Sequence, residues 1–228
     1  MIPWEQLPEN MKTDAVRPYY EAIKKREKQL IIKRMFDVGV SVFLLLLLMP
    51  FMIITGIMIA RDSSGGIFFT QERVTVYGKK FKIYKFRTMV ENAEELGTSV
   101  TSEDDKRVTK IGAFLRKYRL DELPQLINII MGDMSLVGTR PEVCKYVREY
   151  NDEMMATLLL PAGVTSEASI RYKDEAEKLS DAEGDEADRI YVEEILPEKM
   201  KYNLEYVKNY SFFSDIKLCI LTVIKVFS

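Results

Sequence analysis

The run Val38–Ala60, VGVSVFLLLLLMPFMIITGIMIA, holds 23 residues without a single charge. A straight helix of this length covers ~34 Å at ~1.5 Å per residue, which is enough to cross a bilayer. The run begins too far from the N-terminus, and has too many charged neighbours, to be a cleaved signal peptide. The sequence therefore predicts an apolar membrane helix.

Pro50, in the middle of this run, removes one helical hydrogen bond and crowds the preceding turn, so we expect a sharp break there. Basic residues flank the run on both sides, namely Lys28, Lys33, Arg34, Arg61 and Arg73. Because basic flanks tend to stay in the cytoplasm, both ends should lie on the same side of the membrane. The sequence favours a re-entrant helix-break-helix over residues 35–62, with a full transmembrane span as the alternative.

The segment before this helix, residues 1–34, has two parts. Prolines at positions 3, 8 and 18 predict an irregular arm. From Tyr19 to Leu30, apolar residues recur at helical spacing among basic ones. Such a helix can lie on an anionic membrane surface, and an ordinary solvated helix fits the pattern equally well.

Residues 63–228 predict a domain of the α+β class that is mostly helical. Residues 67–71 and 80–86 have the pattern of two short strands, with Gly78 in the loop between them. The spacing of apolar residues predicts amphipathic helices over residues 109–118, 123–130, 141–150, 198–210 and 212–227. The segment 161–165 should be a turn, and the acidic stretch 174–188 should be exposed.

The last predicted helix, 212–227, is apolar around most of its circumference. Its narrow polar edge includes Asp215, Thr222 and Lys225. A helix with this distribution docks on an apolar partner or at the membrane interface.

The composition excludes several kinds of site. The chain contains no histidine, which rules out Ser-His-Asp and Cys-His catalysis and zinc sites built on histidine. The two cysteines, Cys144 and Cys219, are far apart and are expected to be reduced packing residues. With 33 Lys+Arg against 35 Asp+Glu, the charge does not indicate nucleic acid as a partner. A hard cation such as Mg²⁺ is the natural match for the remaining carboxylates.

Adjacent carboxylates, Asp121 and Glu122, follow three cationic side chains in the segment 116–125, RKYRLDELPQ. The apolar stripes on either side are out of phase, so a new helix should begin near Asp121, where the helix dipole favours an ionised carboxylate. Such a carboxylate can bind Mg²⁺ or attack phosphorus. The alternative is structural, with Asp121 as an N-cap and Pro124 as a first-turn proline.

Three further cationic positions could contact phosphate. Lys85 and Arg87 are two residues apart on the second predicted strand, so both should project from one face as a diphosphate clamp, unless they lie on a solvated edge. Arg140 follows Gly138, a residue that lets a ligand approach the backbone, and can grip a phosphate with two hydrogen bonds. Pro141 would be the first residue of the next helix, a role compatible with a place beside the ligand.

Several motifs occur in a fixed order along residues 30–228. They are Lys33-Arg34-x-Phe36-Asp37, the proline-containing apolar helix, Gln71-x-Arg73, Lys85-Phe86-Arg87-Thr88-Met89, Leu120-Asp121-Glu122-Leu123-Pro124-Gln125-Leu126 and Gly132-Asp133-Met134-Ser135-Leu136-Val137-Gly138-x-Arg140-Pro141. Together they resemble the bacterial sugar transferases, the monotopic phosphoglycosyl transferases, in their minimal form.

The resemblance implies transfer of a phosphosugar from a nucleotide-diphosphate sugar, usually a UDP-sugar, to undecaprenyl phosphate, with release of UMP. It implies that Asp121 is the nucleophile and forms an aspartyl-phosphosugar intermediate, that Glu122 helps to hold Mg²⁺ beside it, and that Arg140 and Pro141 lie near the nucleotide. Lys85, Arg87 and Arg116 are expected to contact the diphosphate. The domain 63–228 would then be a cytoplasmic catalytic domain on the bacterial inner membrane, in contact with membrane lipids.

Two other readings stay open: an enzyme that transfers only the sugar and releases UDP, and a non-catalytic membrane scaffold in which Asp121 is only a helix cap. The segment Ser166–Tyr172 departs from the family's usual loop, which leaves the sugar undetermined. The glycan pathway, and whether the chain forms a homo-oligomer, are also undetermined.

Overall fold

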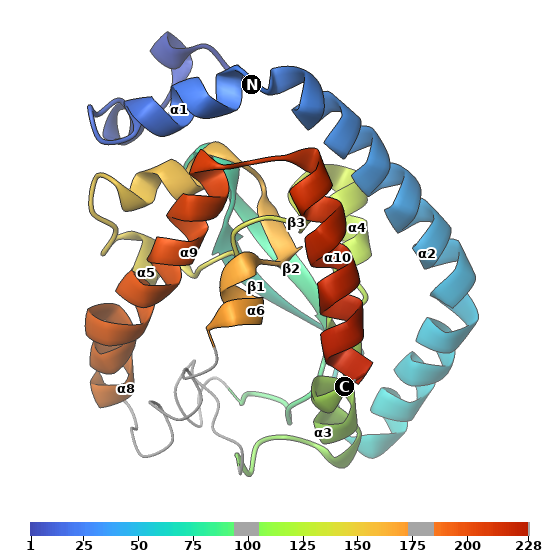
Figure 1. The fold of residues 1–228 in the computed structure, drawn as a ribbon. Helices are drawn as coiled ribbons and strands as arrows, with labels where there is room; N and C mark the ends of the chain where they lie inside the picture. The colour runs from blue at the N-terminus through green and yellow to red at the C-terminus, as the bar shows by residue number, and fades with distance from the viewer. Residues whose placement is uncertain (94–104, 173–184, 228) are drawn as a thin grey trace.

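A computed structural model describes residues 1–93, 105–172 and 185–227, and it confirms the expected mostly helical α+β class (Figure 1). The helices are α1 (Arg17–Lys24), α2 (Glu27–Asp62), α3 (Lys110–Lys117), α4 (Gln125–Met131), α5 (Cys144–Val147), α6 (Glu167–Arg171), α8 (Asp185–Ile190), α9 (Leu196–Lys208) and α10 (Phe212–Phe227). The strands are β1 (Phe68–Val74), β2 (Lys80–Phe86), β3 (Met134–Val137) and β4 (Ala162–Thr165).

The predicted hairpin is confirmed: β1 and β2 pair antiparallel, with Phe68 opposite Phe86 and Val74 opposite Lys80. The loop turns back through two residues of positive φ, Tyr77 and Gly78. One face of β2 packs on α4, where the side-chain amide of Asn128 donates to the Lys82 carbonyl at 2.8 Å. The hairpin is thereby fixed to the helix that follows the two carboxylates.

A second pair of strands was not predicted. β3 and β4 run parallel, with Met134 opposite Ala162, so the expectation of a turn at 161–165 is wrong. A side chain on Gly138 would collide with the Pro161 carbonyl. The absence of a side chain at Gly138 thus allows the neighbouring strand to pack closely. This packing explains the glycine without the expected approach of a ligand to the Gly138 backbone.

The helix expected over 141–150 is also shorter than predicted. α5 begins only at Cys144, so Pro141 is not the first residue of a helix. The acidic stretch 174–188 lies mostly outside the described residues. Within its described end, Asp188 accepts hydrogen bonds from the Lys145 ammonium and the Tyr146 hydroxyl, both at 2.6 Å.

The N-terminal arm forms part of the main hydrophobic core. Buried apolar side chains of the arm and of α1 pack against α9 and the 3₁₀ turn Met154–Leu159, namely Leu7, Met11, Val16, Tyr20 and Ile23. The helix expected from Tyr19 to Leu30 is interrupted, because α1 ends at Lys24 and α2 begins at Glu27. The predicted boundary between residues 34 and 35 falls inside α2.

Within the described residues, α2 is the one helix long and apolar enough to cross a membrane by composition. It is a single helix through Pro50, so the predicted interruption is wrong, whereas its path is curved (Figure 1). Figure 1 shows α2 as an arc around the outside of the domain. Large apolar side chains on its outer side are exposed, including Phe43, Leu46, Leu47, Ile53, Ile54 and Ile57.

The first turns of α2 are fixed by buried ion pairs. The Lys33 ammonium lies 2.6 Å from Asp215 of α10 and 3.7 Å from Asp37. Asp37 in turn accepts from the Ser135 hydroxyl of β3 at 2.6 Å. Asp215, expected on the polar edge of the last helix, is therefore an internal residue that connects α10 to α2.

The last turn of α2 contacts the same domain through different residues. The carboxylate of Asp62 accepts from the Ile111 backbone N–H at the start of α3, at 3.1 Å. The Arg87 guanidinium donates to the carbonyls of Ser63 and Ser64, directly after the helix. Both ends of the apolar helix are thus anchored to one domain.

Candidate active site

The two carboxylates lie in a short 3₁₀ turn, Leu120–Glu122, between α3 and α4. Arg119 has a φ of 53°, which reverses the chain after α3 and confirms the predicted break between residues 118 and 123. α4 begins only at Gln125, with Pro124 as its N-cap residue. Asp121 is therefore not the N-cap of α4, and Pro124 is not a residue of its first turn.

Glu122 is the centre of an ion-pair cluster. Its Oε1 atom accepts from the Lys85 ammonium of β2 at 2.9 Å and from the Arg140 guanidinium at 3.0 Å. Burial raises the pKa of Glu122, but Arg140, Lys85 and Arg119 outweigh burial, and the net pKa lies well below the ordinary value. Glu122 is thus a permanent anion that holds two cations beside Asp121.

Asp121 has the opposite balance. Burial is the largest effect and raises its pKa above the ordinary value of 3.8, and the Glu122 charge adds to the rise, while Lys85 and Arg116 oppose it. The expectation that a helix terminus would favour the ionised form is wrong. A buried carboxylate of raised pKa is more basic, and therefore more nucleophilic once ionised, than an exposed one.

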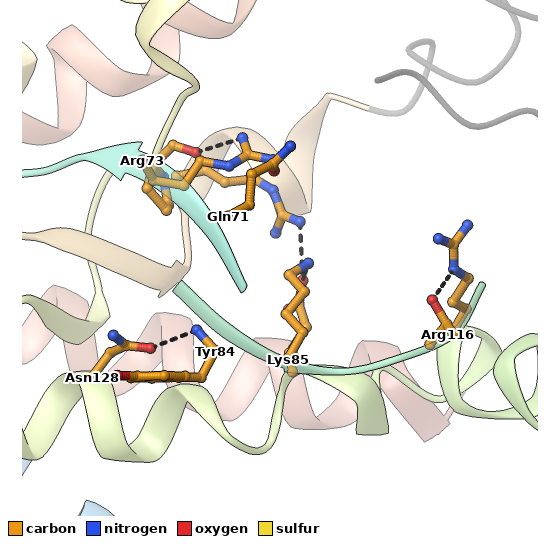
Figure 2. A network of polar contacts seen from close by, with 10 residues as sticks. Gln71, Arg73, Tyr84, Lys85, Arg116 and Asn128 are labelled. Carbon is orange, nitrogen blue, oxygen red and sulfur yellow. Dashed lines mark hydrogen bonds and ion pairs between the residues drawn. The ribbon is translucent and has the colours of Figure 1, made fainter. Parts of the chain in front are cut away.

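The expected phosphate-binding cations are not equivalent. Figure 2 shows Lys85 and Arg116 projecting toward the same side from β2 and α3. Arg116 is oriented by its Nε–H, which donates to the Thr88 hydroxyl at 2.8 Å. Arg87 follows the end of β2, and its guanidinium donates to the carbonyls after α2, so the expected clamp of Lys85 and Arg87 on one strand face is not formed.

Arg73 holds the segment that carries Arg140. Its guanidinium donates to the Pro141 carbonyl at 3.2 Å and to the Gln71 side chain at 2.5 Å (Figure 2). Burial lowers the pKa of Arg73, and the nearby Glu142 carboxylate opposes this effect. The motif Gln71-x-Arg73 was visible in the sequence. The role of Arg73 in positioning Pro141 was not, because it depends on a contact between residues 68 positions apart.

A polar cavity of about 1300 Å³ opens over these residues. Its lining includes both carboxylates, the cations Lys85, Arg116 and Arg140, and apolar side chains such as Phe68. Arg87 lines the same cavity, whereas Pro141 does not line it and contacts Arg73 through its carbonyl. The arrangement can bind a ligand with several negative charges next to a basic carboxylate.

Among residues 1–93, 105–172 and 185–227, no group of three or more acidic or cysteine side chains could enclose a metal ion. Mg²⁺ does not need one, because it usually keeps several waters and binds one or two carboxylates together with phosphate oxygens of a substrate. The pair Asp121 and Glu122 at the wall of a cavity with anion-binding cations fits such a shared site.

Comparison with known proteins gives one consistent result. The family model described as bacterial sugar transferase matches residues 28–228. The chain is 33% identical over 195 residues to a UDP-N-acetylgalactosamine-undecaprenyl-phosphate N-acetylgalactosaminephosphotransferase of Aeromonas hydrophila, with 84% of this chain and 43% of that protein covered.

Two other relatives are similar to a comparable degree. The chain is 32% identical to the UDP-glucose:undecaprenyl-phosphate glucose-1-phosphate transferase of Escherichia coli, over 86% of this chain and 40% of that protein. It is 33% identical to the uncharacterized sugar transferase EpsL of Bacillus subtilis, over 86% of this chain and 88% of that protein. The chain therefore spans less than half of the first two relatives and most of the third.

Proposed function

We propose that this chain, which belongs to the bacterial sugar transferase family, transfers a phosphosugar from a UDP-sugar to undecaprenyl phosphate and releases UMP. The observation that carries the proposal is a basic, buried carboxylate, Asp121, in a cavity that also presents Lys85, Arg116 and Arg140. Two relatives bear names that state a phosphosugar transfer to undecaprenyl phosphate. The reaction would begin the assembly of an envelope polysaccharide or another glycan.

In the first step, a carboxylate oxygen of Asp121 attacks the phosphorus attached to the sugar. The new bond joins that oxygen to phosphorus, and the bond from phosphorus to the bridging oxygen breaks, so that UMP leaves with the electron pair. In the second step, a phosphate oxygen of the lipid attacks the same phosphorus, and the Asp121 carboxylate is released. One difficult displacement is thereby divided into two easier ones.

The cations have to overcome the repulsion between an anionic nucleophile and an anionic diphosphate. Lys85 and Arg140 are held in place by Glu122, and Arg116 is held by Thr88. Pre-oriented charges of this kind stabilise the transition state without reorganisation. Mg²⁺, bound by Asp121 and Glu122 together with the donor, would supply further neutralisation of the diphosphate.

The same proposal includes a re-entrant α2, with the domain on the cytoplasmic face of the bacterial inner membrane. Its support is the anchoring of both ends of α2 to one domain, through Lys33 and Arg34 at the start and Asp62 at the end. A straight helix across a bilayer of ~30 Å would separate its ends by that distance and place them on opposite sides. The exposed apolar side chains of the arc would then lie in one leaflet.

We expect single cysteines at position 34 and position 62, in a variant without the two native cysteines, to be equally protected from a membrane-impermeant thiol reagent applied to intact cells. Both should be labelled after the cells are opened. A cysteine at exposed Lys28 serves as the matched reference for the start of the helix. Labelling of one end only in intact cells would establish a transmembrane span.

The pH dependence of the first step should report the raised pKa of Asp121. The step needs the ionised carboxylate, so its rate should fall as the pH decreases through a pKa above 3.8. Because Lys85 lowers the pKa of Asp121, Lys85→Met should move this acidic limb to higher pH. The measurement is a single-turnover rate of UMP release at saturating donor. A limb that stays unchanged or moves down in Lys85→Met contradicts the assignment.

The identity of the products separates this reaction from its alternatives. We expect the protein, incubated with a panel of UDP-sugars and Mg²⁺ but no lipid, to release UMP in an amount equal to the enzyme and to gain the mass of a phosphosugar on Asp121. Release of UDP only after lipid is added would show transfer of the sugar alone. No release with any donor, together with normal glycan assembly by Asp121→Asn in cells, would favour a scaffold.

A further inference from the structure

A second, smaller cavity of about 440 Å³ lies on the other side of the carboxylate turn. α6, β4 and α10 form its far walls, and α10 is tied to β4 by a 2.8 Å hydrogen bond between the hydroxyls of Thr165 and Thr222. Half-buried apolar side chains cover most of its surface, namely Leu120, Leu123, Leu136, Val164 and Ile170. The chemistry of these walls suits a hydrocarbon and does not suit a nucleotide.

The charged part of the lining is mainly basic. Four cationic side chains, Lys117, Arg119, Arg140 and Lys225, line this cavity against one carboxylate, Glu122. All of these except Lys225 also line the large polar cavity that contains Asp121. The two cavities therefore share a wall at Glu122, next to Asp121, and the small one combines apolar walls with basic side chains.

α10 connects the small cavity to the lipid-facing side of the molecule. Thr222 and Lys225 line the cavity, while other side chains of the same helix are exposed and apolar, including Phe213, Ile220, Val223 and Ile224. A helix with such a face lies at a membrane interface. A ligand that is part hydrocarbon could pass from the bilayer along α10 into the cavity without crossing water.

We propose that the small cavity binds the phosphate and the first isoprene units of the polyprenyl phosphate acceptor. The inference rests on the proposed function, and it places the acceptor between α6, α10 and the carboxylate turn, apart from the donor in the large cavity. Arg119 and Lys225 attract the lipid phosphate from the interface, and the shared wall with Arg140 delivers it to the phosphorus held on Asp121. UMP leaves through the large cavity, and the lipid phosphate then occupies the position opposite Asp121 that UMP has vacated.

The test separates the two halves of the reaction. Val164→Phe fills the cavity, and Lys225→Glu reverses the charge of a lining residue whose ammonium donates to the carbonyls of Ser169 and Ile170. Both variants should form the phosphosugar adduct and release UMP at the wild-type rate, because the donor cavity is unchanged. Transfer of the phosphosugar from the isolated adduct to undecaprenyl phosphate in nanodiscs should be slower by about tenfold or more, as expected for the loss of ~1.4 kcal/mol of binding.

A matched control lies on α10 outside the cavity. Lys217→Glu makes the same charge change at an exposed position. This variant should transfer the phosphosugar at the wild-type rate. If Val164→Phe also loses UMP release, its site is distorted, and Lys225→Glu alone decides the question.

A direct probe locates the lipid independently of any variant. A short polyprenyl phosphate that carries a benzophenone should label residues 164–170 or 222–225 of the wild-type protein, and excess undecaprenyl phosphate, but not inorganic phosphate, should prevent the labelling. Label confined to β1 or α2, or wild-type transfer by Lys225→Glu and Val164→Phe, overturns this inference and leaves the proposed reaction intact. Absence of UMP release by the wild-type protein with every donor would instead reject the proposed reaction.

Discussion

Asp121→Asn should lower UMP release and phosphosugar transfer by at least about 10³-fold, since removing the nucleophile of an enzyme with a covalent intermediate costs up to about 10⁶-fold. Asparagine has nearly the shape of aspartate and leaves Lys85 and Arg116 in place. The loss should therefore appear in the rate of the first step and only slightly in the affinity for the donor. Mass spectrometry should detect no phosphosugar adduct on the variant.

The matched control is Asp133→Asn, which neutralises an aspartate that lies outside both cavities and pairs with the largely exposed Lys79 at 3.1 Å. Surface ion pairs contribute at most about 1 kcal/mol, so this variant should keep the activity of the wild type. Turnover by Asp121→Asn near the wild-type rate, or an adduct on another residue, would falsify the assignment of Asp121 as the nucleophile.

Lys33→Met should destabilise the protein by about 3–5 kcal/mol, the usual cost of leaving buried charges without their partner. The side chains of Lys33 and Asp215 are only 6% and 4% exposed, and Asp37 is buried beside them. Removal of the ammonium leaves two carboxylates in the interior where α2, α10 and β3 meet. Chemical denaturation in detergent micelles, followed by tryptophan fluorescence of Trp4, measures the loss.

A compensating change tests the cause of this loss. Lys33→Met combined with Asp215→Asn removes one charge of each sign, and the asparagine oxygen can still accept the 2.9 Å hydrogen bond from Tyr206. The double variant should recover part of the lost stability. Lys28→Met, at an exposed position of the same helix, should have little effect. A double variant less stable than Lys33→Met would show that the charges are not the reason.

The parts of the fold that local sequence determines were predictable. The hairpin of β1 and β2 follows from its alternation and its glycine turn, and the break after α3 follows from the phase shift of the apolar stripes. The β3–β4 pair was missed because each strand has four residues and the two are adjacent only in the folded chain. α2 continues as one helix through Pro50, although proline lacks the N–H that the helical ladder needs, and local propensity does not predict this continuity.

The site shows the same division. The sequence indicated the carboxylate pair and the cations, and the structure brings Lys85 and Arg140 together on Glu122. The partners of Arg87 were not predictable. β2 ends at Phe86, one residue before Arg87, and the Ser63 carbonyl that accepts from Arg87 lies 24 residues away in the sequence. The predicted direction of the pKa shift of Asp121 was wrong. The shift is set mainly by burial, which depends on the whole fold, whereas the prediction considered only a local helix terminus.

The anchoring of α2 at both ends has a consequence for adaptation to different lipids. A helix that spans a bilayer adjusts to a thicker or thinner membrane by tilting. Neither end of α2 is free to tilt, because Lys33 and Asp62 attach it to the same domain. With the re-entrant topology proposed above, the height of Asp121 relative to the acyl chains is set by these contacts, and hydrophobic mismatch should leave it unchanged.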